Sequence, residues 1–179
     1  MDRQARIDWL VDHYNAPRHK GRLEDAEVSM PGGNPGCGDV VTMHLKADRE
    51  GGRITGLAFE GEGCTISQAA ASILTDRVLR EGMTLDAVRA MTYEDMMEVL
   101  GKEIVSTRPR CATLALGTLK AAAKRLQWNR RLASGEGAAP AALSPVLEEE
   151  GGLVFGEGAF EAAAAPDASS PTHDPLGER

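Results

Sequence analysis

Two neighbouring runs of alternating apolar and polar residues constrain the fold most. Residues 41–46 have the sequence VTMHLK, in which Val, Met and Leu alternate with Thr, His and Lys. This period of two predicts a half-buried strand. Residues 49–52 (REGG) predict a turn and residues 53–61 (RITGLAFEG) a second strand, so the two strands form an antiparallel hairpin. A weaker pattern around residues 27–30 predicts an additional edge strand.

Helical patterns occupy most of the remaining body. Residues 3–15 carry apolar side chains at the spacing of one buried helix face: Ile7, Leu10, Val11 and Tyr14. Capping signals predict further helices at residues 65–81 before Gly82, at 84–91, from the capping box of Thr92 and Asp95 to Gly101, and at 111–128 after Pro109. We therefore expect an α+β domain, with a small antiparallel sheet and helices packed on one face.

The composition changes near residue 132, which divides the chain into two parts. Residues 132–179 hold nine acidic residues and one basic residue, whereas residues 1–131 are nearly balanced, with 18 acidic and 19 basic residues. We expect a folded domain at 1–131 and a mostly disordered acidic tail at 132–179. The apolar patch at residues 153–160 is either part of that unstructured tail or a short docking segment.

The amino-terminal sequence and the charge pattern restrict the location and the partners. Residues 1–14 are charged and lack the apolar run of a signal peptide, and no stretch approaches the roughly 20 apolar residues of a membrane helix. We therefore expect a cytoplasmic protein without a membrane partner. The sequence has no basic run interleaved with aromatic residues, so nothing indicates a nucleic-acid partner.

The three cysteines, Cys37, Cys64 and Cys111, all lie at breaks between predicted elements. An odd number of cysteines in a cytoplasmic chain argues against a disulfide framework and favours a metal site or redox chemistry. Cys64 and Cys111 each begin a predicted helix, whose partial positive charge favours a thiolate. Arg108 and Arg110 add positive charge beside Cys111.

Asp39 lies two residues after Cys37 in the glycine-rich loop and completes a set of four donors. Three thiolates and one carboxylate satisfy a tetrahedral metal. Because carboxylate is a weaker ligand than thiolate for a soft metal, such a site would release its metal more readily than a four-cysteine site. The alternative is that Asp39 only binds backbone amides in a turn. His44 is interpreted as a surface residue on the polar side of its strand.

Four ordered motifs resemble the U-type iron–sulfur cluster assembly proteins, a family that includes IscU, SufU and the N-terminal domain of NifU. These motifs are DHYNAPRHKGRLEDA at 12–26, NPGCGD at 34–39, GEGCTISQAAAS at 61–72 and RCATLAL at 110–116. The resemblance extends over roughly residues 5–127. It implies a small sheet packed by helices, and a protein that accepts persulfide sulfur from a PLP-dependent cysteine desulfurase.

The resemblance also implies a site, made of Cys37, Asp39, Cys64 and Cys111. Arg110 departs from the IscU branch, which has a histidine before the last cysteine, and is similar to the SufU branch, where that position is basic. The segment between Cys64 and Cys111 is too short for the insertion of the SufU branch. The acidic tail is no part of the family pattern.

Three hypotheses follow for the function. The first is a scaffold that receives sulfur on Cys111, beside Arg108 and Arg110, builds a [2Fe–2S] cluster and passes it to apo-proteins or downstream carriers. The second is a zinc-dependent sulfurtransferase, in which Zn²⁺ occupies the same four ligands. The third is a structural zinc-binding interaction domain. Zinc and iron–sulfur clusters share these ligand types, so the sequence leaves the choice open.

Overall fold

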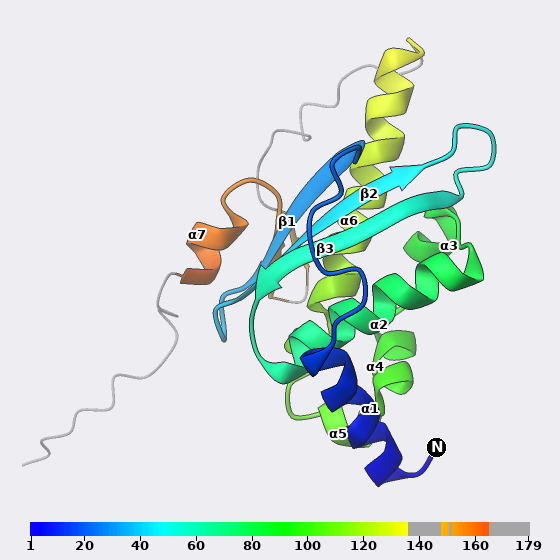
Figure 1. Ribbon diagram of the computed structural model, residues 1–179. Helices are drawn as coiled ribbons and strands as arrows, with labels where there is room; N and C mark the ends of the chain where they lie inside the picture. Colours follow the sequence, from blue (N-terminus) through cyan, green and yellow to red (C-terminus); the bar gives the residue numbers. More distant parts are fainter. Residues whose placement is uncertain (136–147, 151, 165–179) are drawn as a thin grey trace, which may run out of the picture.

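The computed structural model describes residues 1–135, 148–150 and 152–164, which form an α+β fold with an antiparallel sheet (Figure 1). The sheet has five strands in the order β3-β2-β1-β5-β4. The strands are β1 (Val28–Asn34), β2 (Asp39–Ala47), β3 (Ile54–Glu62), β4 (Glu148–Glu150) and β5 (Leu153–Phe155). The helices are α1 (Arg3–Asn15), α2 (Thr65–Glu81), α3 (Leu85–Ala90), α4 (Tyr93–Leu100), α5 (Lys102–Val105), α6 (Pro109–Ala133) and α7 (Ala159–Ala164).

The predicted hairpin is confirmed as β2 and β3, which pair antiparallel from Val40–Glu62 to Ala47–Ile54, with a register shift between Lys46 and Ala47. The weakly predicted edge strand is instead a seven-residue inner strand, β1, which includes the PGGN residues assigned to a loop. The glycines of β1 allow the strand to occupy this inner position, because they have no Cβ. A Cβ at Gly32 would lie 2.0 Å from the Thr118 hydroxyl on α6, and one at Gly33 would lie 2.4 Å from the Ala159 carbonyl on α7. β1 therefore passes between two helices that approach its backbone closely.

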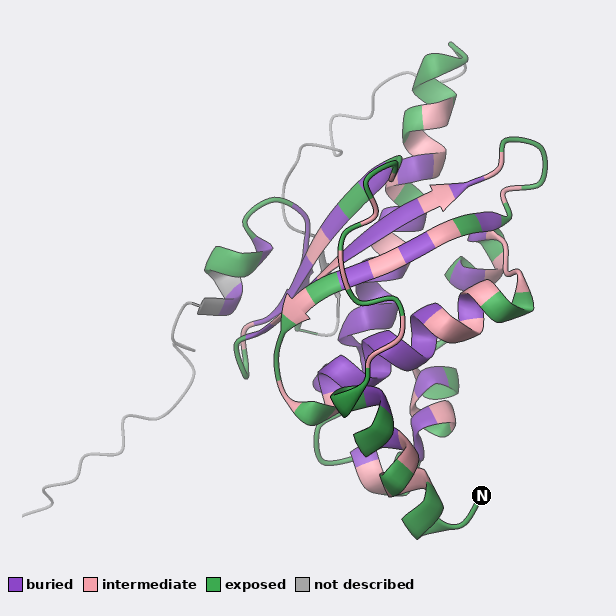
Figure 2. Cartoon of the chain, in the orientation of Figure 1, coloured by how far each residue is buried: buried purple, intermediate pink, exposed green. Residues whose placement is uncertain are grey.

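The main core lies between the sheet and the helices α2 and α6. Side chains from β2, β3 and both helices are fully buried there, including Met43, Leu45, Phe59, Leu74 and Leu116. Figure 2 shows this burial along the strands and along the inner faces of these two helices. Small residues at 69–71 are also fully buried and let α2 pack closely. In the part of the chain that the structure describes, no helix is long and apolar enough to cross a membrane.

The predicted helix caps are confirmed. The Thr92 hydroxyl accepts a hydrogen bond from the backbone N–H of Asp95, and the Asp95 carboxylate accepts one from the backbone N–H of Thr92. Gly82 ends α2 in the left-handed conformation, with φ of 60°. Such caps satisfy backbone groups that a helix end leaves without intrahelical partners.

The prediction of which α1 residues are buried is partly wrong. Leu10 is buried, but Val11 and Tyr14 are each 42% exposed. His13 is buried in their place, and its Nδ1 lies 2.8 Å from the Ser72 hydroxyl of α2. The helix packs through a face that a purely apolar pattern misses, because a buried histidine with a hydrogen-bond partner can belong to a core.

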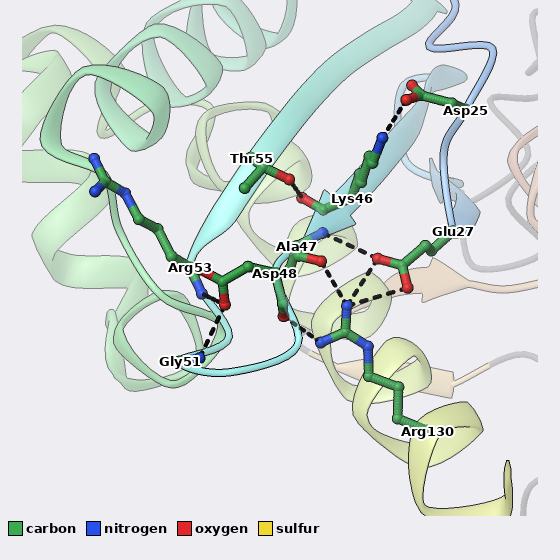
Figure 3. A network of polar contacts seen from close by, with 9 residues as sticks. All are labelled: Asp25, Glu27, Lys46, Ala47, Asp48, Gly51, Arg53, Thr55 and Arg130. Atoms are coloured by element: carbon green, nitrogen blue, oxygen red, sulfur yellow. Dashed lines mark hydrogen bonds and ion pairs between the residues drawn. The ribbon is translucent and has the colours of Figure 1, made fainter.

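A polar network joins the far end of α6 to the sheet (Figure 3). The Arg130 guanidinium donates to the Glu27 carboxylate at 2.8 Å, and to the carbonyls of Ala47 and Asp48, each at 2.7 Å. From Arg130 back to Cys111, α6 spans about 28 Å. From Ala47 back to Asp39, β2 spans about 26 Å. Because these segments of α6 and β2 have similar lengths, the contact of Arg130 with Ala47 at one end places Cys111 next to Asp39 at the other end.

The apolar patch at residues 153–160 docks on the chain's own sheet. β5 pairs with β1 through Gly32–Phe155 and Gly33–Val154. Phe155 is 3% exposed, and a Cβ at Gly117 of α6 would lie 2.5 Å from its ring. α7 lies on the face of β1 opposite α6, since the adjacent residues Gly32 and Gly33 contact α6 and α7 respectively.

Part of the predicted tail is thus ordered structure, in the described pieces β4, β5 and α7. Strands and helices this short carry too few residues for a periodic pattern, which is why the sequence did not indicate them. The expected disorder elsewhere in the tail concerns residues 136–147, 151 and 165–179, which lie outside the described residues. The domain division at residues 131 and 132 stays a prediction.

Candidate metal centre

Three of the four predicted ligands converge at one end of the sheet. Cys37 lies in the loop between β1 and β2, Asp39 begins β2, and Cys111 lies in the first turn of α6. One ligand atom from each lies within 4.8 Å of the other two, and the sulfurs of Cys37 and Cys111 are 3.3 Å apart. The fold therefore brings together donors that are 74 residues apart in the sequence.

The loop geometry explains how Cys37 reaches this position. The backbone N–H groups of Cys37 and Gly38 both donate to the Asn34 carbonyl, at 3.2 and 2.9 Å. Gly38 has φ of 70°, a value that non-glycine residues rarely adopt. The chain consequently turns sharply between Asn34 and Asp39, which face each other at the end of the two strands.

The structure places Cys64 beside this group, with its sulfur outside the 4.8 Å cluster found among the described residues. Cys64 precedes the first turn of α2, as predicted, and its backbone N–H donates to Asp39 Oδ1 at 3.1 Å. A Cβ at Gly63 would lie 2.5 Å from the Ser67 hydroxyl and 2.8 Å from Asp39 Cγ. Glycine at position 63 therefore leaves room for the carboxylate.

The Asp39 carboxylate fits a metal ligand. The residue is 3% exposed, and its Oδ2 has no hydrogen-bond partner in the described structure. Burial by itself would raise the pKa of Asp39, but the nearby thiols of Cys37 and Cys111 and the backbone N–H of Cys64 outweigh it, so the pKa lies below the ordinary value. An ionised carboxylate oxygen with no partner is costly in a buried site unless a cation binds it.

The alternative role of Asp39, that of a turn residue, accounts for only one of its oxygens. Oδ1 does bind a backbone amide, but that amide belongs to Cys64 at the start of α2 rather than to the loop around Asp39. Oδ2 remains without a partner. The carboxylate thus combines a structural contact through Oδ1 with an Oδ2 that has no hydrogen-bond partner among the described residues, and it lies beside the two cysteines.

The prediction that Cys111 favours a thiolate does not hold for the protein without a metal. Burial raises the pKa of Cys111, and the neighbouring Cys37 and Asp39 raise it further. Burial also raises the pKa of Cys37. The Asp39 carboxylate adds to this rise, whereas the Asp39 backbone N–H and the Cys111 thiol oppose it. These pKa shifts apply to the protein without a metal, in which the two thiols and the Asp39 carboxyl group lie close together. A bound divalent cation reverses this effect, because thiols that coordinate a metal lose their protons.

The two predicted arginines lie beside the cysteines. Arg108 and Arg110 are exposed, and with Cys37 and Cys111 they line a pocket of about 370 Å³. A Cβ at Gly36 would lie 3.4 Å from the Arg110 guanidinium, and one at Gly152 would lie 2.7 Å from it. The Arg110 guanidinium therefore lies between the Cys37 loop and the segment that leads into β5.

Asn34 belongs to the site, although sequence reasoning missed it. It is 2% exposed, and its Nδ2 donates to Cys37 Sγ at 2.9 Å and lies 3.7 Å from Cys111 Sγ. An asparagine before Pro-Gly is typical of a turn, so the sequence contained a signal for the loop. It contained none for the contact with Cys111, which depends on the position of α6.

The interpretation of His44 as a surface residue is wrong, because it is 3% exposed. Its Nδ1 lies 2.8 Å from the Ser29 hydroxyl and its Nε2 lies 2.9 Å from the Glu60 carboxylate. Two neighbouring strands supply these partners, which allows a histidine on the polar side of β2 to be buried. His44 is not a member of the candidate ligand group among the described residues.

An α+β fold with two cysteines and an aspartate converging at one end of its sheet, and a third cysteine beside them, defines a class of metal- or cluster-binding domains. The chain belongs to the NifU-like N-terminal domain family, which matches residues 6–132. The resemblance inferred from the four motifs is confirmed.

The relatives of this chain include both cluster assembly scaffolds and a sulfurtransferase. The "Iron-sulfur cluster assembly scaffold protein IscU" of Streptococcus pyogenes serotype M1 is 32% identical over 131 residues, covering 65% of this chain and 80% of its own. The "Zinc-dependent sulfurtransferase SufU" of Bacillus subtilis is 38% identical over 110 residues, covering 58% of this chain and 70% of its own. Both of the first two functional hypotheses therefore have a named relative.

A solved structure confirms the fold independently. The N-terminal part of a nitrogen-fixing NifU-like protein from Brucella abortus aligns with a TM-score of 0.57 and 20% identity, covering 69% of this chain and 98% of its own. At this identity the likeness concerns the fold alone.

Proposed function

We propose that this protein is a scaffold for iron–sulfur cluster assembly. The observation that carries the proposal is the convergence of Cys37, Asp39 and Cys111, with an Asp39 oxygen that has no hydrogen-bond partner among the described residues. Cys64, which lies beside them, is the fourth proposed ligand. Several relatives, including those of Streptococcus pyogenes and Escherichia coli K12, are named as cluster assembly scaffolds.

Sulfur arrives, in this proposal, from a PLP-dependent cysteine desulfurase that carries a persulfide. The Cys111 thiolate attacks the terminal sulfur of that persulfide. The sulfur–sulfur bond of the desulfurase breaks, a new one forms on Cys111, and the desulfurase thiolate is released, with no net oxidation. Cys111 is 4% exposed, so the donor reaches it through the pocket that Arg108 and Arg110 line. Both guanidinium groups favour the anionic persulfide.

The product of the scaffold is a [2Fe–2S] cluster, which it passes to apo-proteins or to downstream carriers. Each transferred sulfur must gain two electrons to become sulfide. Two ferrous ions supply two of the four electrons that one cluster needs, and an external reductant, a dithiol or an electron-transfer protein, supplies the other two. The four ligands are three thiolates and one carboxylate, the donor types that hold such clusters and zinc. The weaker carboxylate suits a site that must release its cargo.

A zinc-dependent sulfurtransferase is the second candidate. The identity with the Bacillus subtilis protein of that name and the basic residue Arg110 before the last cysteine favour it. Zn²⁺ bound by the same ligands would supply charge neutralisation for the thiolates, while Cys111 accepts the sulfur. A structural zinc-binding domain, the third candidate, would not respond to a desulfurase.

One experiment separates these candidates. The pure protein is mixed anaerobically with cysteine, ferrous iron, a dithiol reductant and a cysteine desulfurase, and its visible absorption is recorded after gel filtration. The scaffold predicts a retained chromophore with equal amounts of iron and acid-labile sulfide. Bound zinc and faster alanine production without a chromophore would overturn the scaffold in favour of the sulfurtransferase. Absence of both responses would exclude both candidates.

Replacement of Asp39 with alanine is expected to lengthen the lifetime of an assembled cluster several-fold. Asp39 supplies the weakest ligand, and its loss removes the point at which an acceptor or solvent attacks. The decay of the visible absorption in air measures this lifetime. Asp86→Ala, at an exposed acid of α3, is the matched control and should leave it unchanged. Faster decay in Asp39→Ala than in the wild type would contradict the proposed role.

A further inference from the structure

The side-chain amide of Asn34 has a part that the turn does not require. The turn uses the oxygens of Asn34 alone: its carbonyl accepts from Cys37 and Gly38, and its Oδ1 accepts from the backbone N–H of Gly36 at 3.1 Å. An aspartate would offer the same oxygens, and it is also a favoured turn residue. The NH₂ group is therefore surplus to the turn, and its function must lie elsewhere.

The contact with Gly36 also determines the direction of the amide. Because Oδ1 accepts the Gly36 N–H, the amide nitrogen points the opposite way, toward the two sulfurs. Asn34 is 2% exposed, so water does not satisfy this nitrogen from the surface. Its hydrogen-bond partners among the described residues are Cys37 Sγ at 2.9 Å and Cys111 Sγ at 3.7 Å. Buried amide donors nearly always have partners, and here the partners are sulfur.

We propose that Asn34 is a positioning residue of the metal centre, whose amide N–H groups donate to the sulfurs of Cys37 and Cys111 and thereby increase the affinity of the site for a metal ion. This inference rests on the proposed use of these cysteines as ligands. The Asn34 amide contacts two separate parts of the fold, the β1–β2 turn and the start of α6. It thereby fixes the sulfurs of Cys37 and Cys111 relative to one another.

Two physical effects follow from these contacts. The sulfurs lie 3.3 Å apart, and as thiolates they repel each other, so positively polarised N–H groups between them stabilise the pair. The same hydrogen bonds draw electron density from sulfur and lower the energy of its lone pairs. Hydrogen bonds to ligating sulfurs are a recognised means of tuning a metal centre, and removing such a partner typically weakens metal binding about 10- to 100-fold.

The test uses the full-length protein with Co²⁺ and Zn²⁺ as probes. Asn34→Ser keeps a side-chain oxygen for the turn and removes the amide N–H groups, whereas Asn34→Ala removes both. We expect both variants to bind Zn²⁺ about tenfold more weakly in competition with a chromophoric chelator. We also expect their sulfur-to-Co²⁺ charge-transfer bands to move to longer wavelength, because sulfur lone pairs without hydrogen bonds are higher in energy. Asn15→Ser, at the exposed end of α1, is the matched control.

Each outcome bears on one claim. A shifted band in Asn34→Ser, with a melting temperature of the metal-free protein near that of the wild type, supports the inference. An unshifted band overturns it, even if affinity and melting temperature fall together, because Asn34 would then only maintain the loop. A wild-type protein without any sulfur-to-Co²⁺ band would overturn the metal centre itself, and with it the proposed function.

Discussion

Replacement of Cys111 with serine is expected to abolish transfer of sulfur from a cysteine desulfurase and to weaken Zn²⁺ binding by more than about 100-fold. The loss of affinity should exceed that caused by removing an outer hydrogen-bond partner, because a ligand atom itself disappears. Serine preserves the size of the side chain but supplies neither a thiolate nor a sulfur–sulfur bond. Mass spectrometry after reaction with the desulfurase should show the mass of one added sulfur in the wild type and none in Cys111→Ser.

The other two cysteines provide the comparison. Cys37 is exposed on its loop, whereas Cys111 is buried at the arginine-lined pocket that both cysteines line. If Cys111→Ser still gains sulfur and the peptide map places it on Cys37, then the exposed cysteine is the acceptor and the proposed role of Cys111 is wrong. Cys64→Ser should retain more Zn²⁺ affinity than Cys111→Ser, because the Cys64 sulfur lies outside the closest ligand group among the described residues.

Replacement of Phe155 with alanine is expected to lower the free energy of unfolding by about 3–5 kcal/mol. The Phe155 side chain is 3% exposed, and it packs against α6 at Gly117, where no Cβ fills the space. Its removal leaves a cavity next to a glycine that cannot close it. Chemical denaturation at equilibrium, with an unchanged slope against denaturant, measures this loss.

Phe160→Ala serves as the control for Phe155→Ala. Phe160 belongs to the same carboxy-terminal segment, but it is 43% exposed, so its replacement should change the free energy of unfolding by about 0.5 kcal/mol or less. A loss below about 1 kcal/mol in Phe155→Ala would mean that β5 contributes little to the folded body. The packing of Phe155 against α6 would then be incidental to stability.

The helices α1 to α4 and α6 and the β2–β3 hairpin could be predicted because their signals are local. The capping box of Thr92 and Asp95 and the glycine at position 82 act within a few residues, and the structure confirms both. The alternation along β2 depends on neighbouring side chains that face opposite sides of one strand. Such patterns can be recognised in the sequence without knowledge of distant contacts.

Where the predictions were wrong, a distant partner decided the outcome. Pro31, Gly32 and Gly33 have low strand propensity, yet they form β1 because β2 and β5 pair with it on both sides. His44 is buried because Ser29 and Glu60 from adjacent strands satisfy both ring nitrogens. In each case a long-range interaction overrides a local preference.

The sequence by itself determined which residues are the candidates for the chemistry. Three cysteines at element boundaries and Asp39 beside the first of them have no common structural explanation, so their chemistry could be inferred from type and position alone. Their match to a family pattern then indicated the kind of protein.

Only the tertiary structure decided how those residues meet. Arg130 holds one end of α6 near Ala47, and this brings Cys111 at the other end to Cys37 and Asp39. The same packing places the Asn34 amide between the two sulfurs and the Cys64 sulfur farther out. Distances between residues 74 positions apart depend on how helix and sheet pack, and no local pattern encodes that packing.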